Sequence, residues 1–289
     1  MSEVQANPLQ EARRLLETIR QQVGDEAKSQ LAELDRLLEA AQQRGEGEDS
    51  EALRQRIEDH ISANAKFVSV MVHEIRVPMT SIRGYSDMLG KNVVGELNEM
   101  QSQFVETIRS NVIRMEHLVS DISDISKLHG GRMRLDAKMD MYKNIALQVE
   151  KDTADLASEH NHTLVFDTPS GLPLLNLDGS RLAQALTKLV VNALQYTPDG
   201  GEITVRAENV DGKLKVSVID NGIGMTDEDQ ARIGELFWRA DDERVRTFKG
   251  HGLGLPVAMG FVNHMGGEFF FESEAGKGST FGFVVPGMS

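Results

Sequence analysis

Three glycine-rich segments in the last third of the chain place the strongest limit on its fold. They follow one asparagine, Asn192, in a fixed order: DNGIG at 220–224, GHGLGL at 250–255 and GKGST at 276–280. Glycine lets a backbone approach a phosphate closely and present its N–H groups. An asparagine and a strand-end aspartate add a metal ligand and a hydrogen-bond acceptor to the same pocket. The pattern therefore predicts a nucleotide site.

Composition limits the class of protein. The 289 residues are enough for about two domains, and 40% of them are hydrophobic, enough to form cores. Acidic residues outnumber basic ones by 45 to 31, a formal net charge of −14, which does not favour bulk binding to nucleic acid or anionic membranes. The lack of cysteine excludes disulfides. No run approaches the roughly 18 apolar residues of a membrane span, so we expect a cytoplasmic protein.

Two helical regions precede the glycine-rich segments. Residues 1–50 form an expected N-terminal helical segment, which is either a solvated helix pair or a coiled coil that receives a signal from a sensor protein. Residues 51–131 contain two apolar stripes separated by a break at 91–95, and they predict a helical hairpin. The stripes are Leu53, Ile57, Ile61, Val68, Met71, Ile75, Met79 and Ile82, then Phe104, Ile108, Val112, Met115, Leu118, Ile122, Ile125 and Leu128. Because one hairpin cannot bury a broad stripe on both arms, we expect a homodimer with a four-helix bundle.

Residues 140–289 alternate between helical and strand patterns. We expect helices at 142–160, 179–196 and 252–265, and strands at 163–167, 201–208, 213–220, 267–274 and 279–286. Residues 132–141 are expected to be a linker. Mostly antiparallel strands with helices on one face predict an α/β sandwich. The predicted fold class is thus multidomain, α and α+β: a helical hairpin followed by a sandwich domain.

His73 is the most reactive candidate outside the glycine-rich region. It lies in FVSVMVHEIRVPMTSIRGY, between an apolar run and the charged residues Glu74 and Arg76. Pro78 removes a helical N–H and is expected to bend the helix just after the histidine. A neutral imidazole is a good nucleophile toward phosphorus, and an adjacent carboxylate can accept its proton. Taken alone, His73 is more simply one of eight histidines, on a helix surface.

The ordered set of motifs closely resembles the sensor histidine kinases of two-component systems. The set is His-Glu-hydrophobic-Arg-x-Pro on a hairpin, then Asn, DxGxG, GxGLGL and GxGST, across about residues 60–287. The resemblance implies a dimerisation and histidine-phosphotransfer domain at 51–131 and a Bergerat-type ATP-binding catalytic domain at 140–289. It also implies ATP and Mg²⁺ as cofactors. The implied partner is the receiver domain of a separate response regulator.

The resemblance carries residue roles with it. His73 matches the phosphoacceptor and Glu74 the neighbouring acid, and Asn192 matches the Mg²⁺ ligand. Asp220 would accept the adenine amino group, and the loop before residue 254 would hold phosphates at a helix N-terminus. The implied nucleotide-binding positions are Asn192, Lys188, Tyr196, Asp220, Gly222, Gly224, Phe237, Arg239, Lys249, Gly250, Gly252, Leu253, Gly254 and Thr280.

Four positions depart from the family pattern. Lys188 stands where a second asparagine is usual, and it either reaches a phosphate from the face of Asn192 or weakens the placement of the metal. Gln195 stands where lysine or arginine is common, so one hypothesis is that Lys188 restores the missing charge. Gly234 replaces an aromatic residue in the lid at 226–249, which would loosen it. Val77 stands where family members that dephosphorylate their partner carry threonine or asparagine. Because valine cannot orient a water molecule, we expect weak phosphatase activity.

Two alternatives to an autokinase remain. One is a non-catalytic nucleotide-binding signalling scaffold, which Lys188, Gln195 and Gly234 favour. The other is an ATPase of the gyrase or chaperone type, which the His73–Glu74 hairpin disfavours. The stimulus, the response regulator and the choice between cis and trans phosphorylation are not encoded in any recognisable pattern.

Overall fold

The computed structural model describes residues 48–93, 95–242, 245 and 250–288. Backbone contacts divide the chain into two compact units, Met1–Met71 and Val72–Ser289, each taken by itself. The N-terminal segment expected at residues 1–50 lies, up to residue 47, outside the described residues. None of the helices in the described part of the chain is long and apolar enough to cross a membrane.

The expected helical hairpin is present. Helix α3 (Glu48–Gly90) ends where the sequence predicts a break, and α4 (Glu99–His129) follows. Asn98 caps α4 with a reciprocal pair of hydrogen bonds: its Oδ1 accepts from the Gln101 backbone N–H at 2.9 Å, and its own N–H donates to Gln101 Oε1 at 2.9 Å. This pair satisfies two donors that the helix itself leaves open, which sets where α4 begins.

The hairpin seam repeats every seven residues within the Val72–Ser289 unit. Its buried members are Val72, Met79 and Ser86 on α3 and Val105, Val112 and Val119 on α4. A seven-residue repeat keeps one face of each helix toward its neighbour. The expected stripe is wider than this seam, because Ile75 and Ile82 remain 41% and 45% exposed. The hairpin therefore buries only part of the apolar surface that the sequence predicts.

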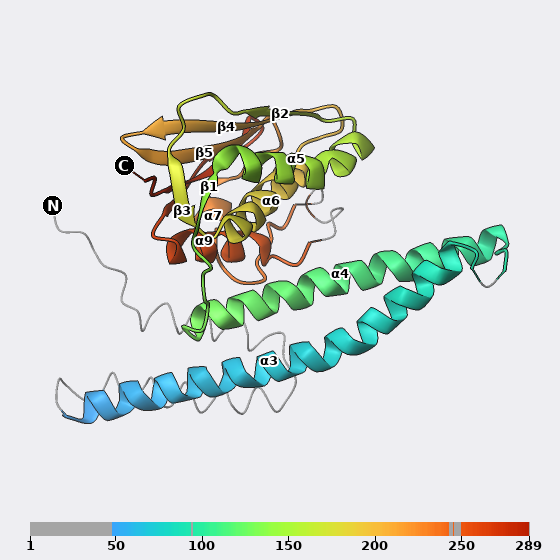
Figure 1. The fold of residues 1–289 in the computed structure, drawn as a ribbon, viewed down its shortest axis with the longest axis horizontal. Helices are drawn as coiled ribbons and strands as arrows, with labels where there is room; N and C mark the ends of the chain where they lie inside the picture. The colour runs from blue at the N-terminus through green and yellow to red at the C-terminus, as the bar shows by residue number, and fades with distance from the viewer. Residues whose placement is uncertain (1–47, 94, 243–244, 246–249, 289) are drawn as a thin grey trace. The chain divides into compact units, whose positions relative to one another are not determined.

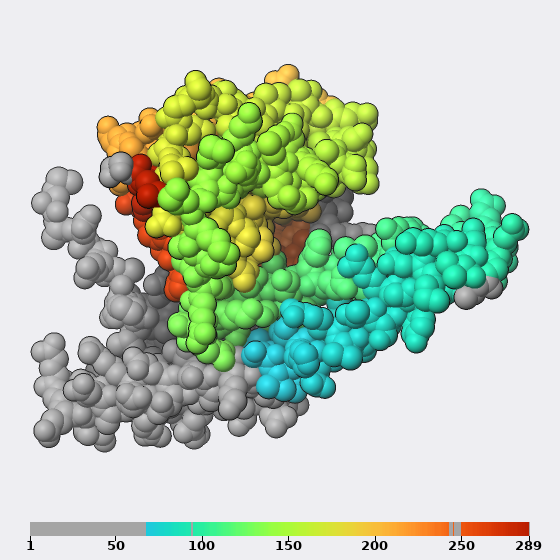
Figure 2. All heavy atoms as spheres, in the orientation of Figure 1, coloured from blue at the N-terminus to red at the C-terminus, as the bar shows by residue number. Residues whose placement is uncertain are grey.

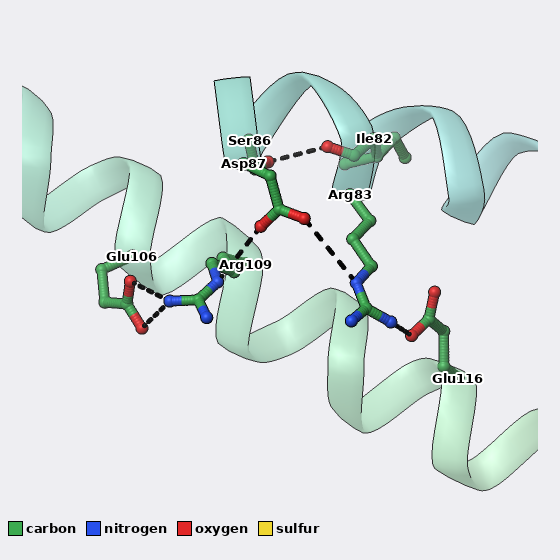
Figure 3. Close-up of polar contacts among 7 residues, drawn as sticks. All are labelled: Ile82, Arg83, Ser86, Asp87, Glu106, Arg109 and Glu116. Atoms are coloured by element: carbon green, nitrogen blue, oxygen red, sulfur yellow. Dashed lines mark hydrogen bonds and ion pairs between the residues drawn. The ribbon is translucent and has the colours of Figure 1, made fainter. Parts of the chain in front are cut away.

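Charged side chains cross between α3 and α4 beside the seam, as Figure 3 shows. Arg83 Nη1 donates to Glu116 Oε2 at 2.7 Å, and Arg109 Nε lies 3.2 Å from Asp87 Oδ1. These groups are partly exposed, so each pair adds little to stability. Their geometry nevertheless records the antiparallel register of the two helices.

The second domain has the expected mixed architecture (Figure 1). In chain order it contains β1 (Lys138–Met141), α5 (Tyr142–Glu159), β2 (Thr163–Asp167), β3 (Leu174–Leu177), α6 (Gly179–Tyr196), β4 (Glu202–Val210), β5 (Lys213–Asp220), α7 (Asp227–Gln230), α9 (Gly254–His264), β6 (Glu268–Glu274) and β7 (Gly278–Val285). The main sheet has the order β2-β4-β5-β7-β6, with the β2–β4 pair parallel and the others antiparallel. The expected helices and the five expected strands are confirmed, with end shifts of one or two residues.

Two short strands were not expected. The predicted linker at 132–141 ends in β1, which pairs antiparallel with β3. Each strand is only four residues long, and each contributes to a ladder with a partner more than thirty residues away. A strand of that length carries too little alternation to be recognised before its partner is known.

One face of the sheet is covered by α5, α6 and α9 (Figure 1). Alternate residues of the central strands point into this layer, including Ile203, Val205, Val216 and Phe283, all fully buried. Helix α6 supplies the opposing face with residues three, four or seven apart: Leu182, Ala185, Leu186, Leu189, Val190, Ala193 and Leu194. The same helix carries Asn192, so the core determines how that side chain is presented.

The core predicts a stability difference between two leucines. Leu186→Ala removes a side chain with 0% exposure and should lower the free energy of unfolding by about 2–5 kcal/mol, through lost burial and the cavity left behind. Leu147→Ala, at a leucine of α5 that is 53% exposed, is the matched control and should change it by about 0.5 kcal/mol or less. Denaturant unfolding of both variants measures the difference, and equal effects would contradict the assigned core.

Candidate functional site

Asp220 forms the floor of the candidate site. It ends β5, is only 8% exposed, and its Oδ1 accepts the backbone N–H groups of Gly222 at 2.9 Å and Ser279 at 3.1 Å. Burial raises the pKa of this carboxyl, and the two N–H bonds oppose that shift. Because both bonds go to Oδ1, Oδ2 is able to accept a hydrogen bond from a ligand.

Glycines bring two of the sequence motifs against each other around Asp220. Gly224 has a φ of 61°, and a Cβ there would overlap the carbonyl oxygen of Glu274. Gly278 has a φ of 105°, and a Cβ would overlap the carbonyl of Asp220 itself. Only glycine tolerates both the positive φ and the close approach. The segments 220–224 and 276–280 are therefore adjacent because neither carries side chains at the contact.

Helix α6 presents the polar side of the site. Asp178 caps its start, with Oδ1 accepting the Arg181 N–H at 3.1 Å. At the other end, the carbonyl of Tyr196 accepts the Ile223 N–H at 3.0 Å, which ties the helix to the segment after Asp220. Asn192 lies half-buried on this helix. Its amide oxygen is a suitable ligand for Mg²⁺, which prefers oxygen ligands and takes most of them from phosphate groups and water.

Lys188 lies one helical turn before Asn192 but points to another partner. Its Nζ donates to Asp121 Oδ1 of α4 at 2.6 Å, and both side chains are largely buried. The sequence interpretation had this ammonium reaching a phosphate. In this structure it is engaged by a carboxylate of the hairpin, and its contact with phosphate stays a prediction.

The phosphate-loop glycines lie between the lid and α9. Gly252 has a φ of 69°, and its carbonyl accepts the Phe237 N–H at 3.1 Å. Arg239 Nη1 donates to the Gly250 carbonyl at 3.2 Å. These bonds join the middle of the lid to the loop. Lys249 lies outside the described residues.

The N-terminus of α9 has room for an anion. Its N-cap, Leu253, has no side chain that caps the helix, and within the described residues no atom lies within 4 Å of a Cβ built on Gly254. Uncapped N–H groups and the helix dipole favour a phosphate at such a position. Pro256 falls in the first turn, where it costs no hydrogen bond. Thr280, on β7, follows Ser279 away from Asp220. These residues fit a nucleotide with its base at Asp220 and its phosphates at α9.

The backbone of the lid explains why glycine replaces an aromatic residue at position 234. Gly234 has a φ of 92°, where an aromatic side chain would be strained, and a Cβ would lie 3.2 Å from Met259 Sδ. The guanidinium of Arg232 lies 5.2 Å from the Trp238 ring centroid, a contact within the lid. The short helix α7, capped by Thr226, was not expected from the sequence.

His73 and Glu74 lie on α3 with exposed side chains, as the sequence predicts. Helix α3 continues through Pro78 up to Gly90. In the described residues, no cluster of three or more His, Asp or Glu side chains could hold a metal ion, so an Mg²⁺ ion would depend on Asn192 together with the phosphates. Sequence reasoning missed Asp121 and Asp124, because an acidic residue on a helix surface carries no signal of its partner.

The geometry at Asp220 predicts how a single atom exchange affects binding. In Asp220→Asn the amide oxygen still accepts the hydrogen bonds from the two backbone N–H groups. The NH₂ group that replaces Oδ2 would place a donor opposite the adenine amino group, which is itself a donor. ATP affinity should fall about tenfold or more, since a hydrogen bond to a charged group contributes about 1.5–3 kcal/mol. Calorimetric titration with Mg²⁺-ATP measures the change, with Asp155→Asn on the exposed side of α5 as control.

The same change, Asp220→Asn, should not lower the stability of the fold, although it weakens ATP binding. Because the pKa of Asp220 is raised, its stabilising contribution is present below the ordinary aspartate pKa and is lost as pH rises through the raised value. Asparagine has no such titration, so Asp220→Asn should unfold at a midpoint no lower than the parent at neutral pH. A clear fall in that midpoint would contradict the assignment.

Comparisons with known proteins agree with this arrangement. Residues 63–131 match the family model of the His Kinase A (phospho-acceptor) domain, and residues 177–288 match that of the histidine kinase-, DNA gyrase B- and HSP90-like ATPase. The histidine protein kinase DivJ of Caulobacter vibrioides is 32% identical over 231 residues, which are 78% of this chain and 38% of that protein. The sensor histidine kinase WalK of Bacillus subtilis is 28% identical over 229 residues, 76% of this chain and 36% of that one.

Solved structures are similar in fold. Full-length ShkA in complex with AMPPNP has a TM-score of 0.66 at 26% identity, covering 78% of this chain and 46% of that one. ThkA in complex with the response regulator TrrA has a TM-score of 0.54 at 23% identity over 81% of this chain and 64% of that one, a likeness of fold alone. The chain thus spans well under half the length of the first curated relatives. With both domain models matched in order, the chain belongs to the sensor histidine kinases of two-component systems.

Proposed function

We propose that the protein is an ATP-dependent autokinase that phosphorylates His73 and passes the phosphoryl group to an aspartate on a separate receiver domain. The observation that carries the proposal is the exposed His73–Glu74 pair, within a phospho-acceptor match, on the same chain as an ATPase-family match that contains the buried Asp220. Neither the catalysis of a gyrase-type ATPase nor the function of a non-catalytic scaffold requires an exposed histidine at this position.

The reaction follows from the groups present. One ring nitrogen of neutral His73 attacks the γ-phosphorus, the bond from that phosphorus to the β–γ bridging oxygen breaks, and ADP leaves. The proton on the other ring nitrogen passes to Glu74, so that the phosphorylated imidazole becomes neutral. Positioning and charge neutralisation provide most of the rate in such transfers.

The chain's own residues hold the nucleotide. Asp220 would accept a hydrogen bond from the adenine, the N–H groups at the start of α9 would bind phosphate, and Asn192 would hold the metal. Mg²⁺, when bound, neutralises charge on the β- and γ-phosphates. The described lid residues, 226–242, would help to exclude water from the phosphates.

The hairpin is the expected site of dimerisation. It leaves large apolar side chains on its outer face within the Val72–Ser289 unit: Ile75, Ile82, Phe104, Ile108 and Met115, each 41–60% exposed. Exposed apolar patches of this kind mark association surfaces. A second hairpin packed on this face would complete a four-helix bundle, so we include a homodimer in the proposal.

Replacing the acceptor tests the activity directly. Parent protein incubated with γ-labelled ATP should gain an acid-labile, base-stable label, and His73→Gln should gain none, because glutamine offers no nucleophilic nitrogen. Nucleotide affinity of the variant, measured by titration, should match the parent and so exclude misfolding. Phosphate release without a labelled protein would instead identify an ATPase, and binding with neither release nor label would identify a scaffold.

We expect phosphatase activity to depend on whether the side chain at position 77 carries a hydroxyl in place of one methyl group. Val77 is 57% exposed. Val77→Thr keeps the shape of the side chain and replaces a methyl group by a hydroxyl, which is able to orient a water molecule. We expect the variant to dephosphorylate a receiver domain faster in the presence of ADP, on the order of tenfold. The receiver is one chosen from a purified panel because it accepts phosphate from the parent. Val77→Ala is the control, and rapid dephosphorylation by the parent itself would contradict the weak phosphatase.

A further inference from the structure

Two ion pairs join the nucleotide domain to the hairpin. Lys188 Nζ lies 2.6 Å from Asp121 Oδ1, and Arg181 Nη1 lies 3.3 Å from Asp124 Oδ1. The lysine and arginine side chains are 22% exposed, and the two aspartates are 14% and 8% exposed. All four residues belong to the Val72–Ser289 unit, and the donors lie two turns apart on α6. Figure 2 shows the green atoms at the end of α4 meeting the yellow atoms of α6.

Apolar packing beside these pairs makes the contact continuous. Helix α9 packs on α4, where a Cβ on Gly260 would overlap Leu128 Cδ1. The Arg181 guanidinium lies 5.0 Å from the centroid of the Phe261 ring. His264 Nε2 lies 3.2 Å from the carbonyl oxygen of Met133, just after the hairpin. The nucleotide domain is therefore docked on the last turns of α4 through α6 and α9.

The docking lysine lies on the same helix as the proposed metal ligand. Lys188 and Asn192 are four residues apart on α6 and share one face of the helix. Phosphates of a nucleotide whose metal is held by Asn192 would lie within reach of a flexible lysine side chain from that face. One ammonium thus has two competing anionic partners, the Asp121 carboxylate and the nucleotide phosphates.

We propose that the Lys188–Asp121 ion pair is a nucleotide-sensitive latch, which holds the ATP-binding domain on the hairpin until the phosphates of bound nucleotide draw Lys188 away from Asp121. The proposal rests on the nucleotide-binding role of the site described above. It assigns Lys188 to communication between the domains as well as to binding.

The energetics suit a latch that opens. A largely buried ion pair gains attraction but loses hydration, and the two terms nearly cancel. Burial raises the pKa of Asp124, although the charge of Arg181 opposes that shift, so the second pair also carries a desolvation cost. The ion pairs therefore add little to the docked state beyond its apolar packing, and losing one of them changes the balance between docked and undocked domains. A competing polyphosphate is then enough to shift the population.

The latch acts at the level of the phosphoacceptor. Two hairpin ion pairs match Arg83 with Glu116 and Asp87 with Arg109. At about 1.5 Å of rise per residue, and with no allowance for a bend at Pro78, the ten residues from Arg83 to His73 correspond to about Ser126 on α4. The fourteen residues from Asp87 to His73 correspond to about Ser123. By this count Asp121 and Asp124 lie along α4 near the level of His73, so the latch would hold the nucleotide domain close to the acceptor and its release would free the domain to turn.

Spin labels report the latch in the full chain. The chain has no cysteine, so Ser120→Cys on α4 and Ser170→Cys on the nucleotide domain, both exposed, give one defined pair of labels in each protomer. Mixing the labelled chain with an excess of unlabelled chain suppresses the distances between protomers of the proposed homodimer. Without nucleotide the label distance should be narrowly distributed. A non-hydrolysable ATP analogue with Mg²⁺ should broaden or shift it, and adenosine, which has no phosphate, should not.

Asp121→Asn separates the latch from nucleotide binding, since the change is on the hairpin. It should broaden the label distance without any nucleotide. By reciprocity it should also raise affinity for the ATP analogue, about fivefold, and leave adenosine affinity unchanged. Asp155→Asn, the matched charge removal elsewhere on the domain, should do neither. Exchange of the two charges, Asp121→Lys with Lys188→Asp, should restore the narrow distance.

Each outcome decides the proposal. An unchanged distance on adding the analogue, an unchanged distance in Asp121→Asn, or an equal effect of Asp155→Asn on affinity would overturn the latch. Unfolding midpoints of the variants exclude loss of structure as the cause. Failure of His73 to take up label, with the distance change intact, would overturn the autokinase and leave the latch standing.

Discussion

The nucleotide domain depends on the burial of one carboxylate. Asp220 ends a central strand, and its Oδ1 accepts N–H groups from two separate segments, those of Gly222 and Ser279. A buried carboxylate without these donors would carry a large desolvation cost. Because the donors are backbone groups, the two segments must approach closely, and only glycine at 224 and 278 allows them to do so. The close approach of these two segments is thus a consequence of satisfying one carboxylate.

Elements with a strong period were predictable from the sequence, and elements formed by distant partners were not. Helix α6 repeats its apolar residues for five turns, so its bounds, 179–196, were found from the sequence alone. Strands β1 and β3 are four residues each and are defined by each other. The same distinction applies within the site. Asp220 and the glycines are adjacent to turns that reveal them, whereas Asp121 is recognisable only from its distance to Lys188.

The departures from the family pattern have different physical meanings. At position 234 the left-handed backbone explains glycine directly, because an aromatic residue would be strained there. At position 188 the backbone is ordinary helix, so the lysine is explained by what its ammonium contacts. The sequence located that ammonium correctly on the face of Asn192, but helical spacing says nothing about a partner 67 residues away on α4. Spacing places a side chain on a face, and tertiary packing selects its partner.

Helix α6 therefore joins three constraints in one rigid body. Its apolar face is fixed by the sheet, its Asn192 is the proposed metal ligand beside the nucleotide, and its Lys188 and Arg181 contact the hairpin. A rigid helix cannot adjust these contacts independently. A displacement of α6 on nucleotide binding would therefore also change its contact with the hairpin, without any change inside the helix. The weakest of the three contacts must then yield. The sheet contact buries a continuous core, whereas the hairpin contact combines a smaller apolar patch at Leu128 with partly compensated charges, so the proposed latch opens at the hairpin contact.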